Sequence, residues 1–144
     1  MASVTDAKTG QPIYSTPGVG RNQVGAYQVS GRPWITGSSQ LAANTEHTIQ
    51  FPTIAKTVTV TRLDAHSGSM FVHFNSRDDG NIIGGLHYLP LNNISESWTV
   101  SVKCNAIYIS APAGGSPREY AVVASLTSID NNNMYNLTGS GLTD

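Results

Sequence analysis

Charge is scarce in this sequence. Charged residues make up 12% of the 144 residues, about half of the usual share, and eight basic residues stand against nine acidic ones. This balance gives no electrostatic footprint for binding nucleic acid. Because the net charge is only −1 and apolar runs are present, disorder driven by charge is excluded as well.

Cysteine and long hydrophobic runs are also missing. Cys104 is the one cysteine, which rules out an internal disulfide and a zinc site built from cysteines. No apolar stretch approaches the roughly 18–20 residues that span a membrane. The first residues have neither the basic region nor the apolar region of a secretory signal peptide. We therefore expect a soluble protein made in a reducing cytoplasm, with no membrane partner.

Small neutral polar residues take the place of the missing charge, since Ser, Thr, Asn and Gly account for 55 of the 144 residues. Apolar and polar residues alternate along many short segments, and no window has the apolar spacing of a helix. Thr57, Thr59 and Thr61 form a row that is typical of a solvated strand face. Strands are predicted over 23–30, 45–51, 54–63, 69–74, 82–89, 95–103, 105–110 and 119–128. Between the first two, a turn is predicted at 31–33, followed by a short segment over 34–36.

This pattern predicts an all-β fold, an antiparallel β-sandwich, with the jelly roll as one arrangement that fits it. Loops are expected at 37–39 and at other Gly- or Pro-rich segments, and Gly84-Gly85 predicts a bulge or bend in the strand over 82–89. The inward positions define a predicted core of Ile49, Phe51, Val58, Val60, Val72, Phe74, Trp98, Val100, Val102, Ile107, Ile109, Val122 and Leu126.

The chain divides into an extended N-terminal arm over 1–22, a β-sandwich domain over 23–129 and a polar C-terminal tail over 130–144. The arm has too much Pro and Gly to sustain a helix or a central strand. It nevertheless carries Ile13, Tyr14 and Val19, which are unusual residues to leave in water. It is either a frayed terminus or an arm that orders on a neighbouring subunit, and we predict the second.

No catalytic constellation stands out. His47 and His73 fall at alternating strand positions, where a half-buried, hydrogen-bonded histidine is the usual case. A metal site could be drawn from His73, His87, Asp78 and Asp79, although Asp78-Asp79-Gly80 is more simply a turn. Paired carboxylates for glycoside hydrolysis could be drawn from Glu46, Asp64, Glu96 and Glu119, of which all but Asp64 begin strands and read as surface charges. We predict no enzymatic activity, no metal and no cofactor.

Aromatic residues offer a second kind of function. A platform for a sugar ring could be formed by Trp34, Tyr88, Trp98, Tyr108 and Tyr120. Trp98 alternates with Val100 and is expected in the core, whereas Trp34 follows Pro33 and is the best candidate for an exposed anchor. Tryptophan is also enriched at the centres of protein interfaces, so Trp34 fits a protein contact equally well.

The segment over 22–37, NQVGAYQVSGRPWITG, resembles the opening of small virion structural proteins of tailed phages, especially marine and cyanobacterial ones. The remainder of the chain is similar to them in size, in composition and in its single β domain. The resemblance implies a capsid decoration or cement protein that stabilises the assembled phage head. The alternative from another class is a lectin-like carbohydrate-binding module.

The resemblance also implies the partners and the location. They are the major capsid protein and sister subunits, with a homo-oligomer, most simply a trimer, on the capsid surface of a virion assembled in the host cytoplasm. The residues expected to contact these partners lie in or near the root of the arm: Ile13, Tyr14, Val19, Arg21, Arg32 and Trp34.

Overall fold

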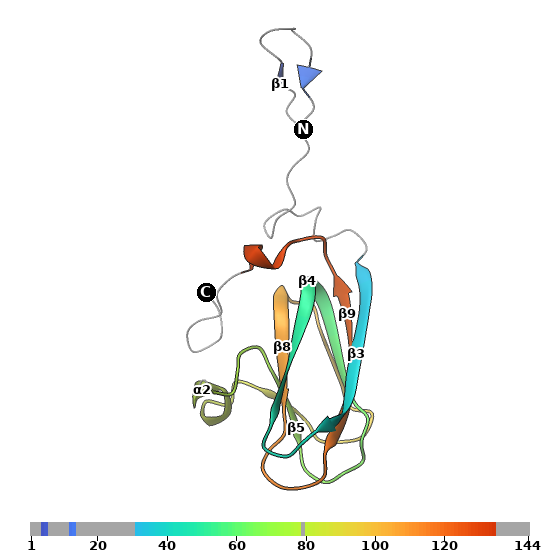
Figure 1. Ribbon diagram of the computed structural model, residues 1–144, viewed down its shortest axis with the longest axis vertical. Coiled ribbons are helices and arrows are strands. Elements are labelled where there is room, and N and C mark those ends of the chain that lie inside the picture. Colours follow the sequence, from blue (N-terminus) through green and yellow to red (C-terminus); the bar gives the residue numbers. More distant parts are fainter. Residues whose placement is uncertain (1–3, 6–11, 14–30, 79, 135–144) are drawn as a thin grey trace.

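The computed structural model describes residues 4–5, 12–13, 31–78 and 80–134. Almost all of its regular structure is β (Figure 1). The helical elements are α2 (Gly80–Gly84) and the 3₁₀ turn η1 (Asn131–Asn133). The strands are β1 (Val4–Thr5), β2 (Pro12–Ile13), β3 (Arg32–Leu41), β4 (Glu46–Arg62), β5 (Met70–His73), β6 (Leu89–Leu91), β7 (Ser97–Val100), β8 (Cys104–Ser110) and β9 (Arg118–Leu126).

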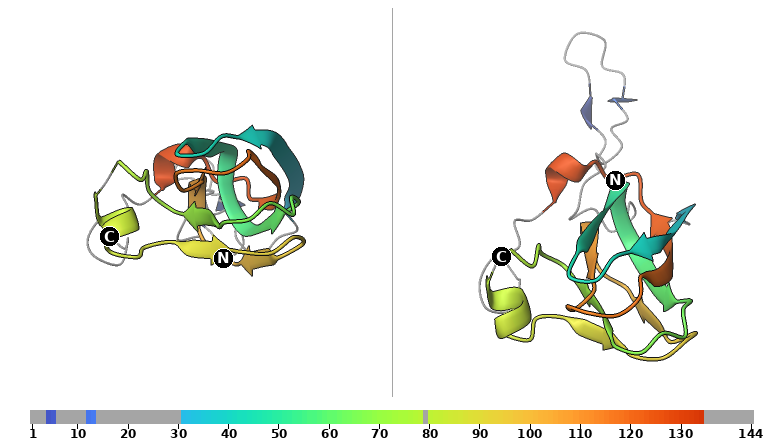
Figure 2. Two further views of the ribbon diagram at one scale, coloured as in Figure 1. Left: turned by 90° about the horizontal axis from the view of Figure 1, so that it is seen from below. Right: turned by 60° about the horizontal axis from the view of Figure 1, so that its bottom comes forward.

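The long strand β4 organises the main sheet. The strand order is β3-β9-β4-β8-β5-β6, all neighbours are antiparallel, and β7 pairs with β4 outside this path. The first part of β4 pairs with β8, and the part from Ala55 onward pairs with β9 and β7. The register shifts between Gln50 and Ala55. The sheet curls over on itself (Figure 2), so strands from both ends of the order enclose one core.

The predicted all-β class is confirmed. The described strands from β3 to β9 belong to one sheet, so the finer expectation of a sandwich or jelly roll is not confirmed. The predicted core is borne out because the period-2 pattern places its residues on the concave side. Nine of these residues are buried, and the other four are half-buried and pack against the core: Phe74, Trp98, Val100 and Val102.

Two arginines are buried beside this core. Arg62 is 0% exposed, and its guanidinium donates to both carboxylate oxygens of Asp64, at 2.8 and 3.2 Å. It also donates to the main-chain oxygens of three loop residues, Gly68, Asn92 and His66, and of Leu91 at the end of β6. Arg118 donates to the carbonyls of Ser116 and Ser67. These contacts fasten the loops at one end of the curled sheet.

The loop predicted over 37–39 is wrong, and the turn predicted over 31–33 is wrong from Arg32 onward. Both segments lie in β3, which pairs with β9 from Arg32 to Leu41, with a register shift after Ser38. Gly37 permits this pairing because the two backbones come very close. A Cβ at that position would lie 2.7 Å from the Tyr120 carbonyl oxygen. The cross-strand hydrogen bonds therefore override the weak strand propensity of Gly and Ser.

The bent strand predicted over 82–89 is also wrong. The short helix α2 occupies the start of this segment, and β6 begins only at Leu89. Ile82 on α2 is fully buried, and the amide of His87 donates to the Ile82 carbonyl at 2.8 Å. The strands predicted over 45–51 and 54–63 form the single strand β4, and the one predicted over 95–103 ends at Val100.

Little of the two ends is described. Within the arm, Val4 and Thr5 pair with Ile13 and Pro12 as a two-residue antiparallel ladder, which the sequence did not predict. Tyr14, Val19, Arg21 and the strand predicted over 23–30 lie outside the described residues, as do residues 135–144 of the tail. The described start of the tail is ordered by Asp130, whose side chain accepts the Asn132 amide at 3.2 Å.

Candidate partner-binding face

The convex side of the sheet presents an uncharged surface, which we call the outer face. It consists of three rows that run across β7, β4, β9 and β3, as fixed by the strand register. None of the residues in these rows is ionisable. The rows are Thr99-Thr59-Val123-Ile35, Ser97-Thr61-Ala121-Gly37 and, without β7, Thr57-Ser125-Pro33.

Two large apolar side chains stand together on the outer face. Ile35 is 72% exposed and Val123 is 46% exposed, and they are direct cross-strand partners. Directly opposed side chains on a sheet lie about 4.5–5.5 Å apart at Cβ, so the two form one continuous apolar spot. The centre of a protein interface is depleted of charged residues, so an apolar spot within an uncharged face makes the outer face a candidate contact surface.

The hydroxyl groups beside this spot are already hydrogen-bonded to each other. The Thr59 and Thr99 hydroxyls share a bond of 2.9 Å, and those of Thr61 and Ser97 share one of 2.7 Å. Covering an unpaired hydroxyl costs free energy, whereas covering a paired one costs far less. The predicted threonine row does face outward, and it is a row that a partner can cover.

One margin of the outer face is an edge strand. β3 stands at the end of the strand order, and no strand in the described part of the chain pairs with its other side. Its residues from Trp34 to Gln40 include neither Pro nor a charged side chain. Natural sheets usually protect such an edge with charge, Pro or a bulge. Here, Pro33 and the register shift after Ser38 protect only the two ends of β3.

The structure separates the residues that the sequence grouped as partner contacts. Trp34 is half-buried and faces the core, where its ring meets Phe51 edge-on at 5.2 Å, so its prediction as an exposed anchor is wrong. Arg32 is exposed at the start of β3, and Ile13 lies in β2. Sequence reasoning missed Ile35 and Val123. The alternation of side chains along a strand could have found them, because neighbouring residues in a strand point to opposite sides of the sheet.

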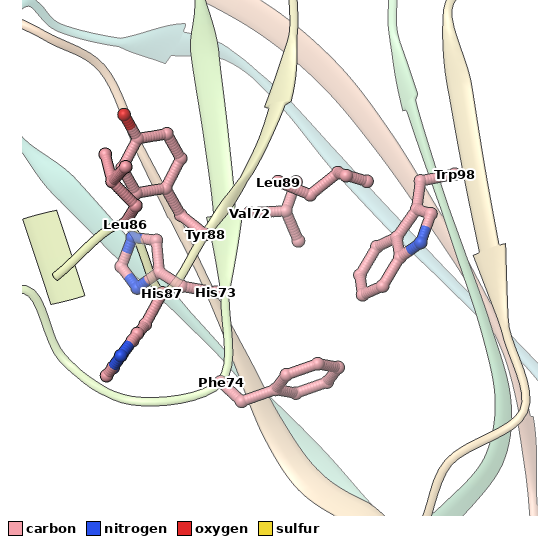
Figure 3. Close-up of a pocket in the computed structure, with 8 residues that line it drawn as sticks. All are labelled: Val72, His73, Phe74, Leu86, His87, Tyr88, Leu89 and Trp98. Atoms are coloured by element: carbon pink, nitrogen blue, oxygen red, sulfur yellow. The ribbon is translucent and has the colours of Figure 1, made fainter. Parts of the chain in front are cut away.

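An apolar cavity of about 280 Å³ lies near the end of β5 (Figure 3). Trp98 lines one side of it, and the ring of Phe74 meets Trp98 at 5.6 Å. The Nδ1 atom of His87, another lining residue, is buried and has no hydrogen-bond partner among the described residues. The remaining lining residues are Val72, His73, Leu86, Tyr88 and Leu89.

Two of the carboxylates singled out in the sequence, those of Glu46 and Glu96, hold loops in place. Glu46 accepts the Ser76 hydroxyl at 2.9 Å and the Arg77 amide at 2.7 Å. Glu96 accepts the amides of Asn92 and Asn93, which lower the pKa of its carboxyl. Among the described residues, no three His, Cys, Asp or Glu side chains are grouped so that they could hold a metal ion.

No protein-family model and no curated protein matches this chain. Among solved structures, the hydroxypropylphosphonic acid epoxidase from S. wedmorenis in complex with fosfomycin aligns with a TM-score of 0.39 and 8% identity. The alignment covers 67% of this chain and 44% of that one, and a likeness of this degree defines neither family nor function. No helix in the described part is long and apolar enough to cross a lipid bilayer.

Proposed function

We propose that this chain is a non-enzymatic virion structural protein, a capsid decoration subunit that binds and stabilises an assembled phage head. The observation that carries the proposal is the outer face, with its exposed Ile35–Val123 pair and its self-paired hydroxyls. The resemblance of residues 22–37 to phage virion proteins supports the major capsid protein as the partner. Sister subunits, most simply in a trimer, are the second partner.

The size of the outer face fits a subunit that works in many copies. Four strands at about 4.8 Å and three rows at about 6.8 Å span roughly 14 by 14 Å between Cα positions. A stable pairwise interface buries about 800 Å² on each partner, which is more than this face offers. Further contacts are therefore needed, and the arm over 1–22 supplies them in this proposal. Each bound copy then adds stability to the shell by mass action.

The double variant Ile35→Asp/Val123→Asp tests the proposal. Two carboxylates in the apolar spot must be desolvated on binding, so occupancy on heads stripped of this subunit should fall at least about tenfold. Occupancy is measured by sedimenting the heads and quantifying the bound chain. Both side chains are exposed in the free protein, so the far-UV circular dichroism should not change.

Ile94→Asp is the matched control, because Ile94 is equally apolar and 55% exposed but lies in the loop before β7. It should bind like the unaltered chain. Full occupancy by the double variant would contradict the role of the outer face, and no binding by the unaltered chain would contradict the proposal itself.

A carbohydrate-binding module is the second candidate. The cavity beside Trp98 and Tyr88 favours it, because aromatic side chains stack on sugar rings. Its lining is largely apolar, however, and a sugar needs several polar partners. A glycan array separates the two candidates, since specific binding that is lost in Trp98→Ala would favour the module.

A further inference from the structure

His73 occupies a closed site on the convex side of β5. It pairs in register with Tyr108 on β8, and its ring stacks on that of Tyr108, with centroids 6.0 Å apart and planes at 8°. The covering segment, which we define as residues 75–78 and 80–88, lies against this side. Tyr88 of that segment meets the ring of Phe71 at 4.3 Å, and His73 is left only 1% exposed.

Both ring nitrogens of His73 are engaged. Nδ1 lies 2.6 Å from the carbonyl oxygen of Asn75, so it must carry the proton and donate it. In the neutral ring, Nε2 then accepts from the Ser110 hydroxyl at 2.8 Å. The arrangement therefore satisfies a neutral imidazole completely, and it ties the start of the covering segment to β8.

The groups that face His73 come from three elements. Glu46 on β4 has a carboxylate oxygen 3.8 Å from Nε2, and the same carboxylate holds the covering segment through Ser76 and Arg77. Tyr108 faces it from β8. The covering segment contributes the positive charge of Arg77, together with His87 and Tyr88, which line the same cavity.

A proton on Nε2 disturbs this arrangement. Nε2 would become a donor, so the Ser110 hydroxyl would have to turn and give up the hydrogen bond it donates. Burial lowers the pKa of His73 below its usual value of 6.5. The Asn75 carbonyl and Glu46 oppose that effect, and Arg77 adds to it. A histidine released to solvent returns to its ordinary pKa, so below about pH 6.5 protons favour the released state.

We infer that His73 is an acid-sensitive clasp: protonation of its ring releases the covering segment from β5 and β8 and uncovers Phe71 and Ile82. The rest of the sheet is expected to stay folded, because the β4–β9 and β3–β9 ladders pair residues 55–62 and 32–41 with β9 and include neither His73 nor Ser110. Release exposes an apolar surface on the side of the body that carries α2, away from β3 (Figures 1 and 2).

Hydrogen exchange of the whole chain, followed by mass spectrometry at pH 7.5, 6.5 and 5.5, tests the clasp. After correction for intrinsic exchange, the opening of peptides from 80–88 should increase by up to about tenfold per pH unit below 6.5. Peptides from β9 should stay protected. His73→Gln should remove this dependence, whereas His66→Gln, at an exposed histidine, should keep it.

Two results would overturn the inference. One is equal opening of the 80–88 peptides at all three pH values in the unaltered chain. The other comes from an NMR titration of the unaltered chain, which needs no folded variant: a His73 pKa at or above 6.5 would contradict the clasp, and a lower value coupled to shifts in 75–88 is the expected result.

Discussion

Asp64→Ala is expected to lower the free energy of unfolding by about 3–5 kcal/mol. The substitution leaves the guanidinium of Arg62, which is fully buried, without its countercharge. It also removes the acceptor for two main-chain amides, those of His66 and Glu119, each 3.0 Å from a carboxylate oxygen. The effect exceeds that of a surface ion pair because both side chains are buried, so the charge left behind is poorly hydrated.

Urea denaturation followed by circular dichroism measures this loss, with Asp78→Ala as the control at an exposed carboxylate. The control should stay within about 0.5 kcal/mol of the unaltered chain. The double variant Arg62→Met/Asp64→Leu should be more stable than Asp64→Ala, since it leaves no unpaired charge. A loss below about 1 kcal/mol in Asp64→Ala would contradict this account of the pair.

The same pair sets a dependence on pH. Burial opposes the charged form of Asp64, but the hydrogen bonds from Arg62 and the two amides outweigh it and lower the pKa to about 2 from its usual 3.8. The ionised carboxylate therefore stabilises the fold above about pH 4, and this contribution is lost as the pH falls through 2. Asp64→Ala should lack that part of the acid transition in a pH series of melting temperatures.

Phe51→Ala is expected to cost about 3–5 kcal/mol, because the ring is fully buried and the substitution leaves a cavity. The ring is also the edge-on partner of Trp34. In a Trp98→Phe background, which leaves Trp34 as the only tryptophan, the emission of Trp34 should shift to longer wavelength as water reaches it. Denaturation and fluorescence of the same sample give both results.

Phe74→Ala is the matched control, since Phe74 is only half-buried and its edge-on partner is Trp98. It should cost less than Phe51→Ala and should leave the emission of Trp34 unchanged. If Phe51→Ala were as stable as Phe74→Ala, neighbouring side chains would have to fill the space left by the ring, and the predicted cavity would be contradicted.

Period-2 patterning made most of the fold predictable from the sequence. Val58 and Val60 alternate with threonines, so inward and outward sides were distinguishable without a structure. The same parity places Arg62 inward, but arginine is rarely buried, and two of its acceptors are the carbonyls of Leu91 and Asn92, about 30 positions away in the sequence. α2 escaped prediction because five residues are too few to display a helical period.

Less of the candidate site was predictable. The outward threonine row was predictable, because its residues alternate along a single strand. The apolar spot was not, because Ile35 and Val123 lie 88 positions apart and only the β3–β9 register brings them together. Trp34 was predicted to be exposed because it follows Pro33, but the β3–β9 register pairs it with the buried Ala124.

The strand β4 has a consequence for how the chain folds. It pairs with β7, β8 and β9, whose residues lie roughly 40 to 70 positions later in the sequence, so none of the ladders of β4 forms from local contacts. Closing such long loops costs entropy before any contact offsets it, which places folding in the slow, millisecond-to-second range of β proteins. Because β4 shares ladders with β7, β8 and β9, we expect these ladders to form and to break together in one cooperative transition.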